Sequence, residues 1–178
     1  MATYVRAFLK VGLIGGVVLA FAMTANLAGT DNELQSLGLW ILVFGFVITG
    51  AYAAREGGQA ELRRAMRTGA LAGVVAGLVI GMVLIALAIV TALGPGIDRF
   101  TEQALSGVTA EQLARLNNDP VKARQIVREA MPLTLSLLAA LVALMMPILG
   151  ALLGLLGGRM APGIFQFAAQ SSDGKTKR

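Results

Sequence analysis

The chain has 178 residues, of which 56% are hydrophobic and 14% charged, and it carries a formal net charge of +5. Ordinary globular domains are about 25% charged, so this composition predicts a helical membrane protein with several spans rather than a water-soluble fold. The sequence has no Cys and no His, which excludes disulfides, thiolate and imidazole metal sites, haem held by His, and Ser-His or Cys-His catalysis.

The first two predicted spans form a hairpin. Residues 11–29 make up an apolar run that follows a segment carrying Arg6 and Lys10 and no acid. A cleaved signal peptide is the alternative, but this run is longer than the usual signal core of about 7–15 residues. After a short acidic turn, residues 37–54 supply the second span, which is long enough to cross the hydrocarbon core.

The third predicted span, residues 69–94, contains a glycine at every fourth position. Because a helix returns to nearly the same face every four residues, these glycines form one smooth groove. Each would cost about 1 kcal/mol relative to alanine in a soluble helix, whereas helices in a bilayer associate through small-residue faces. The predicted helix-packing residues are Gly69, Gly73, Gly77 and Gly81, with shorter ladders at Gly12 and Gly16 in the first span and at Gly150, Gly154 and Gly158 in the fourth.

A basic loop, residues 55–67, joins the second and third spans. It includes Arg63, Arg64 and Arg67, in a segment predicted to form a short helix over residues 60–67. The positive-inside rule places this loop in the cytoplasm. The same three arginines are candidates for contact with anionic lipid headgroups, which attract a nearby cation by about 1 kcal/mol per charge.

The only sizeable segment outside the predicted spans is residues 97–131. Helix-breaking residues at Gly94, Pro95 and Gly96 end the third span. The segment is predicted to form two short amphipathic extracytoplasmic helices, about residues 110–117 and 120–131, the second capped by Asp119. Periodicity leaves open whether they cover the outer headgroup layer, the top of the bundle or a partner protein.

The fourth predicted span covers residues 132–158. Pro147 removes one hydrogen bond from its middle, so we expect a kink there; a static bend is favoured over a hinge because proline is common in membrane helices. Residues 1–165 are thus predicted to form one four-span membrane domain, followed by a flexible basic cytoplasmic tail over residues 166–178.

The charge distribution predicts the orientation. The segments assigned to the cytoplasm hold ten basic and three acidic side chains, and the outer segments hold five basic and seven acidic ones. This bias predicts a multi-pass protein of the inner (plasma) membrane with both termini in the cytoplasm.

No Asp, Glu, Lys or Arg lies in the middle of any predicted span. Ion-coupled transporters need such groups, and intramembrane proteases need buried His or paired Asp, so neither class is favoured. No cofactor, metal site or nucleic-acid partner is expected. The polar residues near the span ends are interpreted as interhelical hydrogen-bond formers; they are Thr24, Asn26, Thr49, Thr134 and Ser136.

Several residues lie in a distinctive order along the chain: the run Glu56-Gly57-Gly58, Ala65, Thr68-Gly69 at the opening of the third span, and Pro132 before a Gly-rich fourth span. In this order the chain resembles a family of small four-span bacterial membrane proteins of unknown function. The resemblance covers most of the chain, although the aromatic residues usual in spans three and four of the family are missing here. It implies a topology and a bacterial setting and adds no activity.

The sequence therefore predicts an all-α, polytopic membrane protein without enzyme activity, acting as a structural or accessory assembly subunit through its glycine faces. One alternative is an oligomeric, holin-like pore with glycine faces aligned between subunits. Another is a lipid- or hydrophobe-binding module with a groove beside Gly73 and Gly77 and the loop arginines at its mouth. The expected partners are membrane lipids, other membrane-protein subunits or a second copy of the chain.

Overall fold

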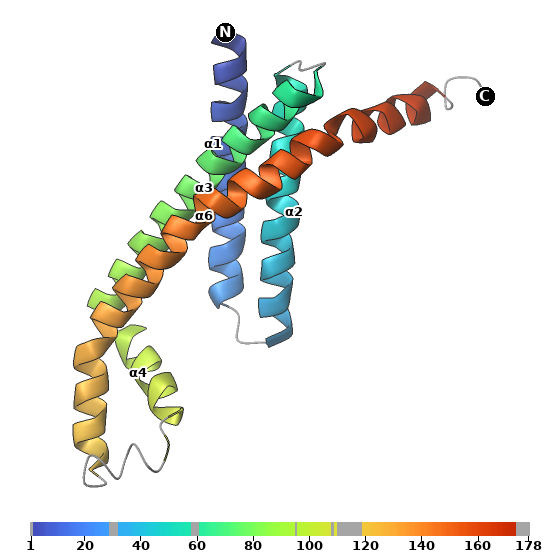
Figure 1. Cartoon of the computed structure of the whole chain (residues 1–178). Helices are drawn as coiled ribbons and strands as arrows, with labels where there is room; N and C mark the ends of the chain where they lie inside the picture. The colour runs from blue at the N-terminus through green and yellow to red at the C-terminus, as the bar shows by residue number, and fades with distance from the viewer. Residues whose placement is uncertain are drawn as a thin grey trace. The chain divides into compact units, whose positions relative to one another are not determined.

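The computed structural model describes residues 2–28, 32–57, 61–94, 96–107, 109 and 119–173, and within these ranges the regular structure is entirely α-helical. Four helices are long and apolar enough to cross a membrane, which confirms the predicted all-α, multi-pass class. They are α1 (Ala2–Ala28), α2 (Asn32–Glu56), α3 (Leu62–Leu93) and α6 (Pro120–Asp173), with a short α4 (Gly96–Ser106) after α3 (Figure 1).

The chain divides into two compact units. Unit 1 comprises Met1–Gly81 and Ala143–Arg178, and unit 2 comprises Met82–Val142. Unit 1 therefore contains α1, α2, the first part of α3 and the later part of α6. Unit 2 contains the end of α3, all of α4 and the beginning of α6.

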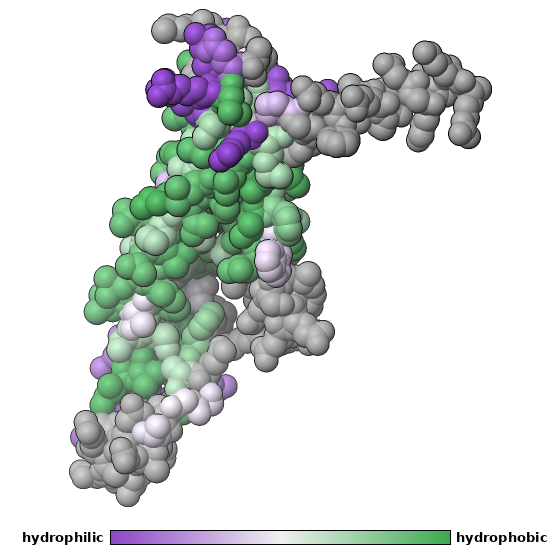
Figure 2. Space-filling view, turned by 45° about the vertical axis from the view of Figure 1, so that its right-hand side comes forward, coloured by the Kyte–Doolittle hydropathy of each residue, from purple (hydrophilic) through white to green (hydrophobic). Residues whose placement is uncertain are grey.

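Small side chains make up much of the buried interior of unit 1, beside a few large ones such as Phe46. Ala53, Ala72 and Ala76 are fully buried, whereas large apolar side chains such as Val18 and Phe44 are well exposed. This distribution suits a protein whose surroundings are as apolar as its own side chains, because helices in lipid gain more from close contact than from burying bulky groups. Figure 2 shows the resulting broad hydrophobic surface, with charged side chains gathered at one end of unit 1.

Two ion pairs join α4 to the beginning of α6 in unit 2. Arg124 Nη2 lies 2.9 Å from Glu102 Oε1, and Arg128 Nε lies 3.4 Å from Asp98 Oδ1. Because both acids and both arginines are spaced four residues apart, the two pairs show that α4 and the beginning of α6 run antiparallel. Thr101, which lies on α4 between the two acids, is buried.

The basic segment before the third span belongs to that span's helix. The expected separate helix over residues 60–67 is instead the first part of α3, which begins at Leu62. The Glu61 carbonyl accepts hydrogen bonds from the backbone N–H groups of Arg64 and Ala65, both at 3.0 Å, and so opens the helix. No helix breaker occurs between Leu62 and Gly69, so the backbone ladder continues into the apolar run.

Helix α6 does not begin at Pro132, as expected from the sequence, but at Pro120. The predicted cap is confirmed: Asp119 Oδ1 accepts from the backbone N–H groups of Val121 at 3.0 Å and Lys122 at 3.2 Å. Pro132 removes a single hydrogen bond from a helix with strong helix formers on both sides, and that loss does not end it. The second outer helix and the fourth span are therefore one element, and α6 extends into the predicted tail as far as Asp173.

Of the predicted pair of outer helices, the structure describes only the second. The first of them, residues 110–117, lies outside the described residues, as do residues 174–178 of the tail. Helix α4 was not predicted. Its signal was the spacing of Ile97, Thr101 and Leu105 along one face, with Asp98 in the first turn, where a negative charge favours the helix dipole.

Candidate functional site

The glycine ladder of α3 lies directly against α6 in unit 1. Each step of four residues forward on α3 meets a step of about four residues back on α6, so the two helices run antiparallel in constant register. We call this contact the α3–α6 seam. Its pairs are Ala65 with Gly158, Gly69 with Gly154, Gly73 with Gly150, Gly77 with Met146, and Gly81 with Ala143.

Main chain meets main chain along this seam. A Cβ atom on Gly73 would collide with the carbonyl oxygen of Gly150, and a Cβ on Gly150 would collide with the carbonyl oxygen of Gly73. Gly69 and Gly154 are related in the same reciprocal way. Because a glycine hydrogen occupies the direction a Cβ would take, each of these carbonyl oxygens faces a Cα–H group of the other helix.

Two further sets of glycines join the remaining helices of unit 1. A Cβ on Gly12 of α1 would lie 2.7 Å from the Ala72 carbonyl oxygen, and one on Gly16 would lie 2.9 Å from the Ala76 Cα atom, so α1 packs on α3 beside the α3–α6 seam. Gly50 of α2 faces the backbone of Gly154, and Gly157 of α6 faces the backbone of Val47. Four helices are thus joined through small residues.

Four glycines at helix contacts were not among the predicted packing residues, because they do not recur at a four-residue spacing. Two of them lie at the contact between α1 and α2. A Cβ on Gly15 would lie 2.5 Å from the Thr49 hydroxyl oxygen, and Gly45 faces the Leu19 side chain. Their partners are single side chains on a neighbouring helix, which no repeat within one helix reveals. The missed residues are Gly15, Gly45, Gly50 and Gly157.

Helix α6 occupies the place where the sequence suggested a lipid groove. Gly73 and Gly77 are both buried, and the space beside them holds the backbone of Gly150, Met146 and Pro147. The expected groove at these glycines is therefore wrong, because the same absence of side chains that would open a groove to lipid lets another helix close it.

Pro147 lies at the α3–α6 seam. The position of a Cβ on Gly77 is 2.7 Å from the Pro147 Cα atom. Proline cannot donate to the carbonyl four residues earlier, which belongs to Ala143, and this oxygen lies 3.1 Å from the position of a Cβ on Gly81. The helix is continuous through Pro147. The carbonyl freed by the proline therefore faces a bare glycine of α3.

The threonines expected to bridge helices bond instead to their own backbones. The hydroxyls of Thr24 and Thr49 donate to the carbonyls four residues earlier at 2.7 Å, and that of Thr134 does so at 3.0 Å. A carbonyl within the same helix is always in reach of a threonine hydroxyl, whereas a group on a neighbouring helix is not. The Asn26 side chain lies outside the described residues.

Charged side chains of unit 1 meet at one end of the bundle. Lys10 Nζ donates to Glu56 Oε1 at 2.8 Å and thereby joins the N-terminal part of α1 to the end of α2. A buried cluster of Ala51, Ala54, Ala65 and Ala161 brings α2, α3 and α6 together at the same end. Arg63, Arg64 and Arg67, in the first turns of α3, are exposed there, and Arg64 pairs with Glu61 at 3.2 Å.

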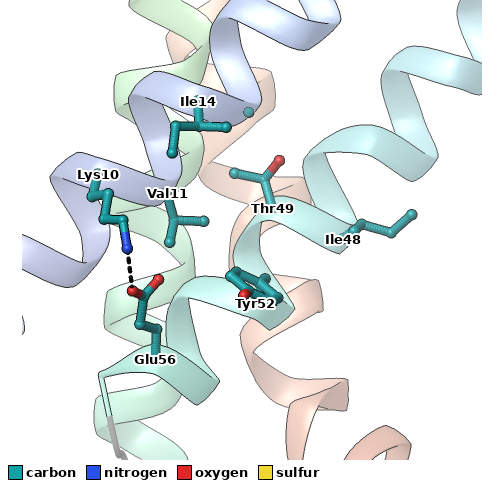
Figure 3. Close-up of a pocket in the computed structure, with 8 residues that line it drawn as sticks. Lys10, Val11, Ile14, Ile48, Thr49, Tyr52 and Glu56 are labelled. Atoms are coloured by element: carbon teal, nitrogen blue, oxygen red, sulfur yellow. Dashed lines mark hydrogen bonds and ion pairs between the residues drawn. The ribbon is translucent and has the colours of Figure 1, made fainter.

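A groove of about 320 Å³ lies between α1 and α2 in unit 1 (Figure 3). The Lys10–Glu56 ion pair closes one end of it, with Tyr52 beside the pair, and Ile14 and Ile48 line the other end. We call this feature the α1–α2 groove. Its lining residues are Lys10, Val11, Ile14, Gly15, Ile48, Thr49, Tyr52 and Glu56.

Among the residues that the structure describes, no group of three or more His, Cys, Asp or Glu side chains is placed to hold a metal ion. Comparison with known protein families, curated proteins and solved structures finds no match for this chain. The resemblance to small four-span bacterial proteins stays a prediction.

Proposed function

We propose that this chain is a non-enzymatic integral membrane protein that serves as a structural or accessory subunit of a membrane assembly. The observation that carries the proposal is the α3–α6 seam, in which backbone meets backbone at five successive levels. Such a contact fixes two helices in one register, because sliding either helix would bring a side chain against the partner's main chain. A fixed framework is what a scaffold requires.

The buried hydroxyl groups of unit 1 support the same proposal. Thr49 and Thr68 are buried, and each donates to a carbonyl of its own helix, at 2.7 and 2.8 Å. These hydroxyls are therefore already used in helix structure, whereas a transport path or a catalytic site needs polar groups that are available to a substrate.

The packing of the glycines disfavours the pore alternative. A holin-like channel built on glycine faces needs those faces at the borders between subunits. In unit 1 the same glycines face other helices of the same chain. We therefore infer that a partner would contact the large apolar side chains on the outside of the bundle.

Photocrosslinking in the native membrane tests this proposal. Single photoreactive residues would replace Val18 on α1, Phe44 on α2 and Leu152 on α6, all of which are well exposed. A structural subunit should give a discrete protein adduct at one or more of these positions, either with another membrane protein or with a second copy. Membranes dissolved in sodium dodecyl sulfate before irradiation provide the control, and adducts with lipid alone at all three positions would contradict the proposal.

A flux assay separates the proposed role from the pore alternative. The purified chain in liposomes should leave an entrapped small dye or a potassium gradient intact, because the proposal assigns it no conducting path. Release of either solute in proportion to the protein added would favour the pore.

A further inference from the structure

The α1–α2 groove has the same division between polar and apolar ends as a membrane lipid. Its polar end holds a cation, an anion and a phenol, and its apolar end is lined by aliphatic side chains that are themselves exposed to the surroundings. Glu56 is the last residue of the apolar span in α2, so the polar end lies where the hydrocarbon core gives way to headgroups.

We propose that the α1–α2 groove binds one phospholipid whose headgroup carries both a phosphate and a primary amine, with an acyl chain lying between Ile14 and Ile48. The occupant is a phosphatidylethanolamine-type lipid, because the groove presents an ammonium and a carboxylate together.

The ion pair retains unused bonding capacity. Lys10 Nζ has three donors and gives one to Glu56 Oε1, and the side chains of both residues are partly exposed, Lys10 at 63% and Glu56 at 33%. A phosphate can accept from the remaining ammonium donors, and a primary amine can donate to Glu56. Both are charge-assisted hydrogen bonds, which are stronger than bonds between neutral groups.

The register of α1 and α2 indicates which part of the headgroup lies nearer the apolar end of the groove. Gly15 lies against Thr49, and Leu19 lies against Gly45, so Lys10 is level with the residue two places before Glu56. The backbone of Lys10 therefore lies nearer the apolar end of the groove, and the backbone of Glu56 lies farther out, at the end of α2. In a phospholipid the phosphate is likewise nearer the acyl chains and the amine is farther out.

This order distinguishes the proposed lipid from its competitors. A choline headgroup has a quaternary ammonium without N–H groups, so it cannot donate to Glu56. A glycerol headgroup carries no cation, which leaves the carboxylate facing a net anionic lipid. The groove should therefore prefer the ethanolamine headgroup over both.

The test measures lipid retention by the delipidated full chain, using native mass spectrometry with ethanolamine, choline and glycerol phospholipids of identical acyl chains. The unmodified protein should prefer the ethanolamine lipid over the choline lipid by about tenfold, since a hydrogen bond to a charged group has that effect on an affinity. Equal retention of the two lipids, or no retention of either, would overturn the proposal.

Two variants of the ion pair separate lipid recognition from helix pairing. Glu56→Gln should abolish the preference for the ethanolamine lipid. The double variant Lys10→Glu/Glu56→Lys keeps an ion pair between α1 and α2 but reverses its order, so it should keep the helical circular dichroism signal and lose the preference. A folded double variant that still prefers the ethanolamine lipid would also overturn the proposal.

A second pair of variants leaves the charges untouched and applies even where a charge variant fails to fold. Ile14→Trp should fill the apolar end of the groove and reduce retention of the ethanolamine lipid at least tenfold. Val17→Trp adds the same ring to an exposed position of α1 that does not line the groove, so it should retain the lipid like the unmodified protein. Equal retention by these two variants would contradict binding in the groove.

Discussion

At Gly77 the position of a side chain is taken by the main chain of another helix. The Met146 carbonyl carbon and the Pro147 Cα atom each lie 2.7 Å from where a Cβ atom would be. Leu78, the next residue along the chain, is half exposed on the outside of the bundle. A change of side chain should therefore be poorly tolerated at Gly77, which faces backbone, and well tolerated at Leu78, which faces the surroundings.

We expect Gly77→Leu to destabilise the protein by about 3 kcal/mol, since overpacking of a close contact costs about 1–3 kcal/mol and backbone is harder to displace than side chains. Leu78→Ala, the matched control, should cost less than about 1 kcal/mol. Unfolding in mixed micelles, followed by circular dichroism, measures both. Equal destabilisation by the two changes would argue against backbone contact at Gly77.

Gly15 faces a side chain instead of a backbone, so the clash made by a larger residue at this position can be relieved by shortening that side chain. A Cβ there would lie 2.5 Å from the Thr49 hydroxyl oxygen and 2.8 Å from the Thr49 methyl carbon. Gly15→Ala alone should destabilise the protein by about 1–2 kcal/mol, and Thr49→Ala in the same chain should recover most of that loss. A double-mutant cycle measures the coupling, and strictly additive effects would contradict the contact.

At the scale of single residues, the sequence predicted a packing glycine only where glycines recur at a regular spacing. The glycines of α3 recur every four residues and were selected as packing residues, whereas Gly15 and Gly50 follow no such ladder and were not. The hydrogen-bond partner of the Thr49 hydroxyl was also wrongly predicted: it is the Gly45 carbonyl of its own helix, not a group on a neighbouring helix. The α1–α2 groove depends on the contact between Gly15 and Thr49, so it could not be predicted either.

At the scale of elements, the prolines of the chain differ in their effects. Pro95 follows α3 and is flanked by Gly94 and Gly96, which supply no helix-forming side chain, and the predicted helix end there is confirmed. Pro132 and Pro147 are flanked by strong helix formers, and α6 is continuous through both. Of these three prolines, only Pro95, which lies between two glycines, coincides with a helix end, and the predicted boundary at Pro132 was wrong.

Two exposed ion pairs join the short helix α4 to α6. Asp98→Lys/Glu102→Lys would place two cations opposite Arg128 and Arg124 and should speed amide hydrogen exchange in α4 several-fold, because exposed ion pairs contribute up to about 1 kcal/mol each. Adding Arg124→Glu and Arg128→Glu restores opposite charges and should restore slow exchange. Unchanged exchange in the repelling variant would show that other contacts hold α4.

At the scale of the whole molecule, the amino-acid composition predicted a membrane protein, because the proportion of charged and apolar residues reflects whether lipid or water surrounds the chain. A chain with so few charges has to place its large apolar side chains in contact with lipid, and such side chains are exposed along the outside of unit 1. The charge distribution also predicts that Lys10, Arg55 and Arg159 lie on one side of the membrane. The ion pair of Lys10 with Glu56 joins the N-terminal part of α1 to the end of α2, so these two charges lie at the same end of unit 1.

The predicted orientation can be measured with single cysteines, because the natural sequence has none. Glu61→Cys should react with a membrane-impermeant maleimide only in inverted membrane vesicles, and Gly107→Cys only in right-side-out ones. Both positions are exposed, so access to the reagent depends on the side of the membrane. Labelling of both cysteines in the same kind of vesicle would contradict the predicted topology.

The central claim is that backbone contacts along the α3–α6 seam hold this bundle together, and adding the same methyl group at two glycines tests it most directly. At Gly73 the added carbon would collide with the Gly150 carbonyl oxygen, whereas at Gly107 the nearest atom would be 3.6 Å away, an ordinary contact. The measurement is the free energy of unfolding in mixed micelles. Gly73→Ala should lower it by about 2 kcal/mol and Gly107→Ala by less than about 0.5 kcal/mol. An equal decrease in the free energy of unfolding for the two variants would contradict the claim.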